Sequence, residues 1–116
     1  SIMEGGNLSW MEFARVDMRV GTVVQADLFP EALRPAYIIH IDFGDLLGVL
    51  KSSAQISFHY SIEDLIGRQV VAVVNFPPKQ IAQLMSSCLV TGFPDENGNI
   101  VLTSVERPVP NGSRLF

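Results

Sequence analysis

The sequence predicts a small, mostly β-strand domain, a five-stranded Greek-key barrel with short added helices. The chain has 116 residues, which is one domain's worth and enough to bury a core without disulfides or metals. Short apolar or alternating runs recur along it, separated by turns that contain glycine or proline. One brief helical segment lies between the third and fourth of these runs, and no repeat or linker divides the chain.

The N-terminal residues are expected to form a lead followed by a short helix. The first seven residues are polar and glycine-containing, so we interpret 1–8 as a disordered lead or a cloning remnant and 9–116 as the folded domain. Ser9 and Glu12 fit a capping box, in which the serine hydroxyl caps an amide and the glutamate reaches back. The helix that follows, to about Ala14, is expected to close one end of the barrel.

Three strands are predicted in the first half of the chain. Alternating residues indicate a first strand over 19–28, in which Gly21 permits a bulge or a sharp bend. A proline-bracketed loop leads to the clearest strand, 37–43, whose odd-numbered residues share one apolar face. After a glycine turn, residues 46–50 return as a third strand that runs into Lys51-Ser52-Ser53.

The second half begins with a helical turn at 61–64. Residues 69–74 are almost wholly apolar, as expected for a strand that is buried on both faces. Asn75-Phe76-Pro77-Pro78 ends this strand, because proline cannot continue a hydrogen-bonded ladder. Two further strands, 88–93 and 99–104, are joined by an Asn-Gly turn that indicates a hairpin.

This order of elements is typical of a barrel of the OB type. Such barrels bind ligands, often oligonucleotides, through their middle strands and the loops that flank them. An SH3-like barrel is the main alternative. The helical segment between the third and fourth strands favours the OB type.

Charge is distributed unevenly along the chain. The net charge of −4 argues against indiscriminate nucleic-acid binding, which needs a strong positive field, but leaves room for a local basic patch. No acidic residue occurs between Asp64 and Asp95, and this acid-free part of an acidic protein is a candidate anion site. The single cysteine and the lack of a secretory signal or a bilayer-spanning run predict a cytoplasmic protein without membrane insertion.

The sequence predicts a binding protein rather than an enzyme. It contains no phosphate-cradling glycine loop. Cys88 and the two histidines, His40 and His59, lack the spacing of a metal site. We therefore expect no catalytic residue, no metal and no cofactor.

Polar residues gather in two segments that each follow an apolar run. An ammonium group attracts phosphate, and hydroxyls and amides donate hydrogen bonds to phosphate oxygens or base edges. The candidate RNA-binding residues are Lys51, Ser52, Ser53, Gln55, Asn75, Lys79 and Ser86. The alternative, that these are ordinary solvated side chains, stays open on this evidence alone.

Five motifs carry a resemblance to a known family. They are Phe29-Pro-Glu-Ala32, Ile41-Asp-Phe-Gly44, Lys51-Ser-Ser-Ala-Gln-Ile56, Asn75-Phe-Pro-Pro-Lys-Gln-Ile81 and Pro108-Val-Pro-Asn-Gly112. In these motifs the chain resembles the CsaA secretion chaperone family. That family consists of free-standing tRNA-binding OB-fold domains, related to the C-terminal tRNA-binding domain of methionyl-tRNA synthetase.

The resemblance implies a homodimer that binds tRNA through the candidate residues above. It also implies an ATP-independent chaperone that binds non-native or pre-secretory polypeptides and cooperates with the export machinery. The alternative function is a tRNA-binding module that acts in trans in RNA handling or aminoacylation, with no chaperone role.

The chain departs from the family pattern at several cationic positions. Basic residues are usual where this chain has Leu33, Ile38, Gln80 and Met85, and glycine is usual at Gln83. Fewer cations weaken phosphate binding, whereas added apolar surface suits adaptable peptide binding. The candidate peptide-binding residues are Leu33, Ile38, Phe76, Leu84 and Met85. The alternative, that they pack in the core or at a dimer contact, stays open.

Overall fold

The structure is a computed structural model that describes residues 6–116, so residues 1–5 of the predicted lead lie outside the described residues. Its elements, in chain order, are α1 (Trp10–Ala14), β1 (Met18–Leu28), β2 (Tyr37–Asp42), β3 (Val49–Ala54), α2 (Ile62–Leu65), β4 (Gln69–Val73), β5 (Lys79–Ile81), β6 (Leu84–Ser86), β7 (Leu89–Val90), β8 (Gly92–Pro94) and β9 (Ile100–Leu102). Over residues 6–116, no helix is both long and apolar enough to cross a membrane.

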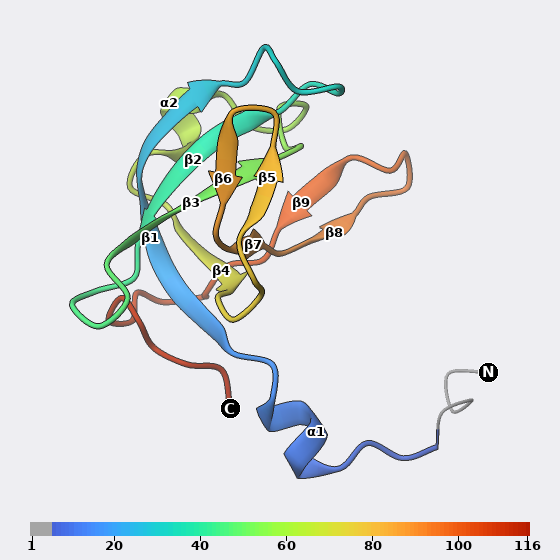
Figure 1. The fold of residues 1–116 in the computed structure, drawn as a ribbon, viewed down its shortest axis with the longest axis vertical. Coiled ribbons are helices and arrows are strands. Elements are labelled where there is room, and N and C mark those ends of the chain that lie inside the picture. The colour runs from blue at the N-terminus through green and yellow to red at the C-terminus, as the bar shows by residue number, and fades with distance from the viewer. Residues whose placement is uncertain (1–5) are drawn as a thin grey trace.

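Five strands form one antiparallel sheet in the order β3-β2-β1-β4-β7, with α2 between β3 and β4 in the chain. The sheet curls into a nearly closed barrel (Figure 1). Across the remaining gap, the backbone N–H of Ser87 donates to the carbonyl oxygen of Lys51 at 2.9 Å. The predicted OB-like barrel is confirmed.

The core lies inside this barrel. Tyr37, Ile39, Ile41 and Phe43 are buried on one face of β2 and beyond its end, as their alternation predicts. On β4, the four residues 70–73 are all buried. Hydrophobic burial of this kind contributes about 25 cal/mol per Å² of apolar surface, so these two strands supply much of the driving force for folding.

The bulge expected at Gly21 lies three residues further along β1. The pairing of β1 with β2 shifts register between Val23 and Gln25, which leaves Val24 about half exposed. Gly21 is needed instead for the close approach of β1 and β2, because a Cβ atom there would lie 2.5 Å from Cγ2 of Ile41.

The third strand begins later than predicted. Residues 45–47 form a turn, and β3 runs through the segment 51–54 that was expected to follow it. Lys51, Ser52 and Ser53 therefore alternate between the two faces of the sheet instead of forming a loop.

A small hairpin, β5–β6, was not predicted from the sequence. Lys79–Ile81 pairs with Leu84–Ser86, and Ala82 occupies the turn with a φ of 50°. Leu84 is buried in a second apolar cluster with Phe29 and Ala36. Burial of the Leu84 side chain thus holds the hairpin in place. The sequence indicated only a loop here, because prolines and polar residues dominate the segment.

The expectation that α1 closes one end of the barrel is wrong. Its capping box is present, with Ser9 and Glu12 exchanging hydrogen bonds of 3.0 and 3.1 Å, but the helix buries none of its residues. Figure 1 shows α1 standing away from the barrel. The C-terminal segment lies beside the start of β1 instead, where the N–H of Leu115 donates to the carbonyl oxygen of Met18.

Candidate nucleic-acid interface

The two polar segments singled out in the sequence lie side by side in the fold. The N–H of Ser53 on β3 faces Oγ of Ser86 on β6 at 3.4 Å, so the β5–β6 hairpin sits against the outer side of β3. Figure 1 shows the hairpin close to β3, which is an edge strand of the sheet.

Two hollows lie between these segments and share four lining residues, Ser53, Lys79, Gln80 and Ile81. The larger, the Phe76 hollow, has a volume of about 690 Å³ and is lined by Phe76, Pro77 and Pro78 on one side and by residues 86–89 on the other. The smaller, the Arg34 hollow, has a volume of about 380 Å³ and brings Leu33 and Arg34 next to Gln55 and Lys79. We call the two adjoining hollows together the groove.

The groove is cationic. Neither hollow has an aspartate or glutamate among its described lining residues. Arg34 and Lys79 form no ion pair within residues 6–116, whereas Arg19 and Arg107 each pair with a carboxylate. Unpaired cations without acidic neighbours attract anions more strongly than neutralised ones, so the groove suits a polyanion.

Strand alternation decides which residues of β3 can reach a ligand. Lys51 and Ser53 point outward, and Gln55 follows them as an exposed residue. Ser52 points inward, is 1% exposed, and donates its hydroxyl to the carbonyl oxygen of Ser53 at 3.0 Å. Ser52 therefore supports the strand and presents no surface to the groove.

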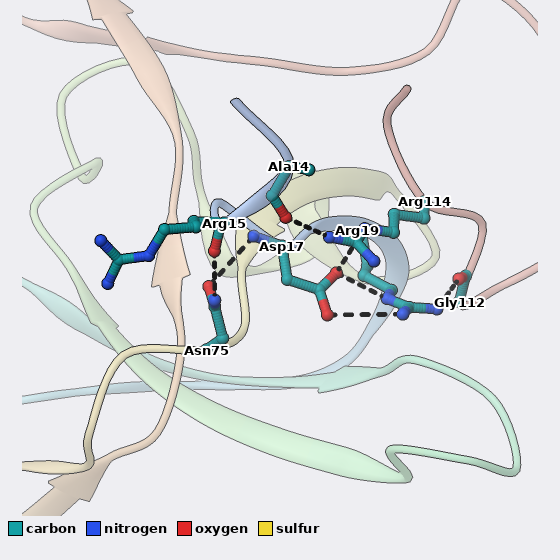
Figure 2. A network of polar contacts seen from close by, with 7 residues as sticks. All are labelled: Ala14, Arg15, Asp17, Arg19, Asn75, Gly112 and Arg114. Atoms are coloured by element: carbon teal, nitrogen blue, oxygen red, sulfur yellow. Dashed lines mark hydrogen bonds and ion pairs between the residues drawn. The ribbon is translucent and has the colours of Figure 1, made fainter. Parts of the chain in front are cut away.

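Asn75 is held in a structural role. Its carboxamide donates to the carbonyl oxygen of Arg15 at 2.6 Å and accepts from the N–H of Asp17 at 3.1 Å. Figure 2 shows this amide bridging the segment between α1 and β1. Both ends of the amide are occupied, so Asn75 anchors the loop that carries Phe76 and Lys79.

Ser86 and Cys88 border the Phe76 hollow. Ser86 Oγ lies 3.4 Å from the carbonyl oxygen of Cys88, and the thiol of Cys88 faces the carbonyl oxygen of Lys51 at 3.7 Å. Burial raises the pKa of the Cys88 thiol to about 12, because desolvation disfavours the thiolate. Cys88 is a packed, unreactive thiol at the base of the groove.

The five predicted peptide-contacting residues divide into two groups. Leu33, Phe76 and Met85 are exposed, Phe76 by 55% of its surface. Leu84 is buried, and Ile38 packs against the same second cluster. The alternative left open by the sequence, packing in the core, thus holds for Leu84 and in part for Ile38.

Arg34 was missed as a site residue from the sequence. It lies in the loop between β1 and β2, 17 positions before Lys51, and the fold brings it into the same hollow as Gln55 and Lys79. The bracketing prolines of this loop, Pro30 and Pro35, were the available signal, since they mark a stiff segment that could hold a side chain in place.

A family model described as "Putative tRNA binding domain" matches residues 18–114. The chain belongs to the tRNA-binding domain family. Two solved structures of this type are similar over nearly the whole chain. A chaperone CsaA from Bacillus anthracis is 46% identical with a TM-score of 0.88, and covers 96% of this chain and 100% of its own. A CsaA chaperone protein from Picrophilus torridus is 39% identical with a TM-score of 0.87, and covers 95% of this chain and 100% of its own. The predicted resemblance to CsaA is confirmed.

A curated relative is much longer than this tRNA-binding domain. Methionine–tRNA ligase of Methanocaldococcus jannaschii is 29% identical over 113 residues, which is 97% of this chain but 17% of the ligase. The chain thus spans about a sixth of that enzyme's length. What the two share is the tRNA-binding domain.

Proposed function

We propose that this protein is a CsaA-like, ATP-independent chaperone that binds non-native or pre-secretory polypeptides and also binds tRNA in the groove. The observation that supports this most directly is the convergence of Ser53, Arg34 and Lys79 in adjoining hollows without a carboxylate in their described lining. Its action is binding without a catalytic step, in the cytoplasm, with the export machinery as a further partner.

In this proposal the RNA contacts come from polar residues whose side chains reach the surface. Lys51, Gln55 and Lys79 are exposed, whereas Ser53 and Ser86 are partly buried. Lys51 lies outside the lining of both hollows, and the other four belong to it. Ammonium groups neutralise phosphates, and hydroxyl and amide groups fix the register of the RNA. Ser52 and Asn75 belong to the same site as supports, because one is buried and the other has both amide atoms engaged.

Non-native polypeptide would use the apolar side of the same surface. Phe76 and Met85 are exposed on the loop and hairpin beside the groove, and Leu33 is exposed at its far end. Methionine and aromatic side chains adapt to different apolar partners, as a binder of many sequences requires. Sharing one surface predicts that tRNA and polypeptide compete.

A homodimer is supported by apolar surface that a single copy leaves uncovered. Trp10 and Met11 on α1 are 81% and 83% exposed. A separate, mainly apolar hollow of about 590 Å³ lies along the C-terminal segment and is lined in part by Phe93, Leu115 and Phe116. A two-fold arrangement in which α1 of each copy covers this C-terminal hollow of the other would bury both surfaces.

The tRNA part is tested by titrating labelled tRNA with the wild type and with the double variant K51A/K79A at several salt concentrations. Each lost phosphate contact lowers the slope of log affinity against log salt by about 0.9, so the double variant should lose nearly two units. Arg107→Gln is the matched control, since Arg107 is exposed and is not part of the groove lining. An unchanged slope in K51A/K79A would remove this groove as the tRNA site.

The chaperone part is tested by aggregation of a chemically denatured client protein. One dimer per client should suppress light scattering without ATP, and excess tRNA should reverse the suppression. A lack of suppression, with tRNA binding intact, would favour the second candidate, a tRNA-binding module that acts in trans. That candidate is supported by the shared domain of the methionine–tRNA ligase. It predicts that adding this protein speeds aminoacylation by a ligase from which the domain has been removed.

A further inference from the structure

The groove has two chemically different halves that meet at Ser53 and Lys79. Building on the proposed tRNA binding, we propose that it holds an unpaired nucleotide. Its phosphate would occupy the Arg34 hollow and its base the Phe76 hollow. The RNA feature recognised is then a single-stranded segment, whereas a base-paired stem offers only its backbone.

The Arg34 hollow has the chemistry of a phosphate site. Arg34 supplies a planar guanidinium, which can donate two parallel hydrogen bonds to a phosphate. Lys79 supplies an ammonium, and Gln55 supplies an amide donor, all lining the same hollow of about 380 Å³. Gln80 also lines this hollow, but its amide donates to the carbonyl oxygen of Ala82 at 2.7 Å, so it is oriented along the hairpin and leaves the phosphate to the other three.

The Phe76 hollow has the chemistry of a base site. Its volume of about 690 Å³ lies within the range of small-molecule pockets, roughly 300–1,000 Å³. Phe76, Pro77, Pro78 and Leu89 form an apolar lining, to which the polar residues Ser86 and Ser87 also contribute. Aromatic rings stack on unpaired bases of any sequence, while hydroxyls can meet base edges.

The base site is held in place before any ligand arrives. Pro77 follows Phe76 directly and restricts its backbone to extended conformations, and Pro78 has a fixed φ. The Asn75 amide anchors the preceding residue through its bonds to Arg15 and Asp17. A backbone that is already positioned reduces the entropy lost when the ring stacks, which favours recognition of a base over general apolar adhesion.

A base-paired stem does not fit this pattern. In a duplex the bases are stacked on each other and paired inside the helix, so their faces cannot enter a recessed apolar hollow. Only an unpaired nucleotide presents a free base face and its phosphate together. The four lining residues common to both hollows, Ser53, Lys79, Gln80 and Ile81, place the two side by side, as one nucleotide requires.

The test compares three RNAs with the full chain: tRNA, a short single-stranded oligonucleotide, and a duplex of equal length. The single strand should bind at least tenfold more tightly than the duplex. Arg34→Gln should weaken single-strand binding several-fold and lower its salt slope by about 0.7, the value for one phosphate contact on a single strand. Phe76→Ala should weaken single-strand binding about tenfold with the salt slope unchanged. Phe76→Tyr, which keeps an aromatic face, should bind the single strand as the wild type does.

The controls are Arg107→Gln and Phe58→Ala, an exposed cation and an exposed aromatic outside the groove lining. Thermal melting checks that each variant is folded, as expected for exposed positions. Equal affinity for duplex and single strand, or R34Q and F76A effects no larger than the controls, would overturn this inference while tRNA binding stands. Loss of unfolded-peptide binding in both variants with RNA binding intact would assign the groove to polypeptide instead. Failure of the wild type to bind tRNA would overturn the proposed function itself.

Discussion

The carboxamide of Asn75 donates to the carbonyl oxygen of Arg15 at 2.6 Å and also accepts from the N–H of Asp17 at 3.1 Å (Figure 2). This bridge joins the end of β4 to the segment between α1 and β1, 60 residues away in the chain. Asp17 in turn pairs with Arg19 at 2.8 Å and with Arg114 at 3.4 Å. One polar network thus holds the N-terminal segment, the C-terminal segment and the groove loop together.

Asn75→Ala should lower the stability of the fold, whereas its direct effect on tRNA affinity should be small. Two hydrogen bonds are lost, each worth about 1 kcal/mol, so the free energy of unfolding should fall by about 1–2 kcal/mol. Urea unfolding measures this loss, and Asn75→Asp is the partial control because it keeps the acceptor for Asp17. A large drop in tRNA affinity at unchanged stability would show that the amide contacts RNA instead.

Trp10→Ala should shift the proposed dimer towards monomer. Trp10 is exposed within a single copy and touches Phe13 edge-on at 6.0 Å between ring centroids, so its removal costs the monomer little. Aromatic residues often dominate interface energies, with effects of about 2 kcal/mol or more on truncation. Sedimentation velocity over a range of concentrations measures the change. Leu46→Ala, at an exposed turn, is the control, and equal behaviour of both variants would exclude α1 from the interface.

Gln80→Lys with Met85→Lys should strengthen tRNA binding. The two residues are direct partners across the β5–β6 hairpin and both are exposed beside the groove. Each new cation that meets a phosphate should raise the salt slope by about 0.9. Like charges directly opposite each other cost the hairpin up to about 1 kcal/mol, so the single variants are measured as well. If affinity stays constant in all three, the hairpin does not face the RNA.

Gly112→Ala should destabilise the protein markedly. Gly112 has a φ of 92°, and a Cβ atom there would lie 2.6 Å from the carbonyl oxygen of Phe43. Gly98→Ala is the matched control, with a φ of 85° and open space around its Cβ position. The left-handed backbone alone costs about 1–2 kcal/mol, so G112A should lose clearly more than G98A in urea unfolding. Equal losses would mean that the chain relaxes around residue 112 without strain.

Cys88 should resist alkylation in the folded protein. Its thiol pKa of about 12 keeps it protonated at pH 8, and only the thiolate reacts with iodoacetamide. In the unfolded chain the thiol ionises near pH 8.5, so the unfolded state binds fewer protons above that pH and stability falls as pH rises from about 8.5 towards 12. Alkylation rates with and without guanidinium test the first point. Cys88→Ala should remove this contribution to the fall in stability at alkaline pH. Rapid alkylation of the native protein would contradict the burial of the thiol.

Much of the fold could be predicted because it is encoded locally. The alternation over Tyr37 to Phe43 places one apolar face inward in any register, and the continuous apolar run after Gln69 suits only a strand covered on both sides. Local signals also predicted the capping box of Ser9 and Glu12, the order of the predicted elements, and the two polar segments. These features depend on neighbours in the chain, so no knowledge of distant contacts was needed.

The sequence by itself determined a barrel of the OB type, its inward faces, and two polar segments that each follow an apolar run. Only the tertiary structure decided which of those polar side chains are free. It turned Ser52 inward, committed the Asn75 amide to Arg15 and Asp17, and brought Arg34 beside Lys79. The physical reason is that the availability of a polar group depends on contacts between residues distant in the chain. Periodicity and composition describe only near neighbours.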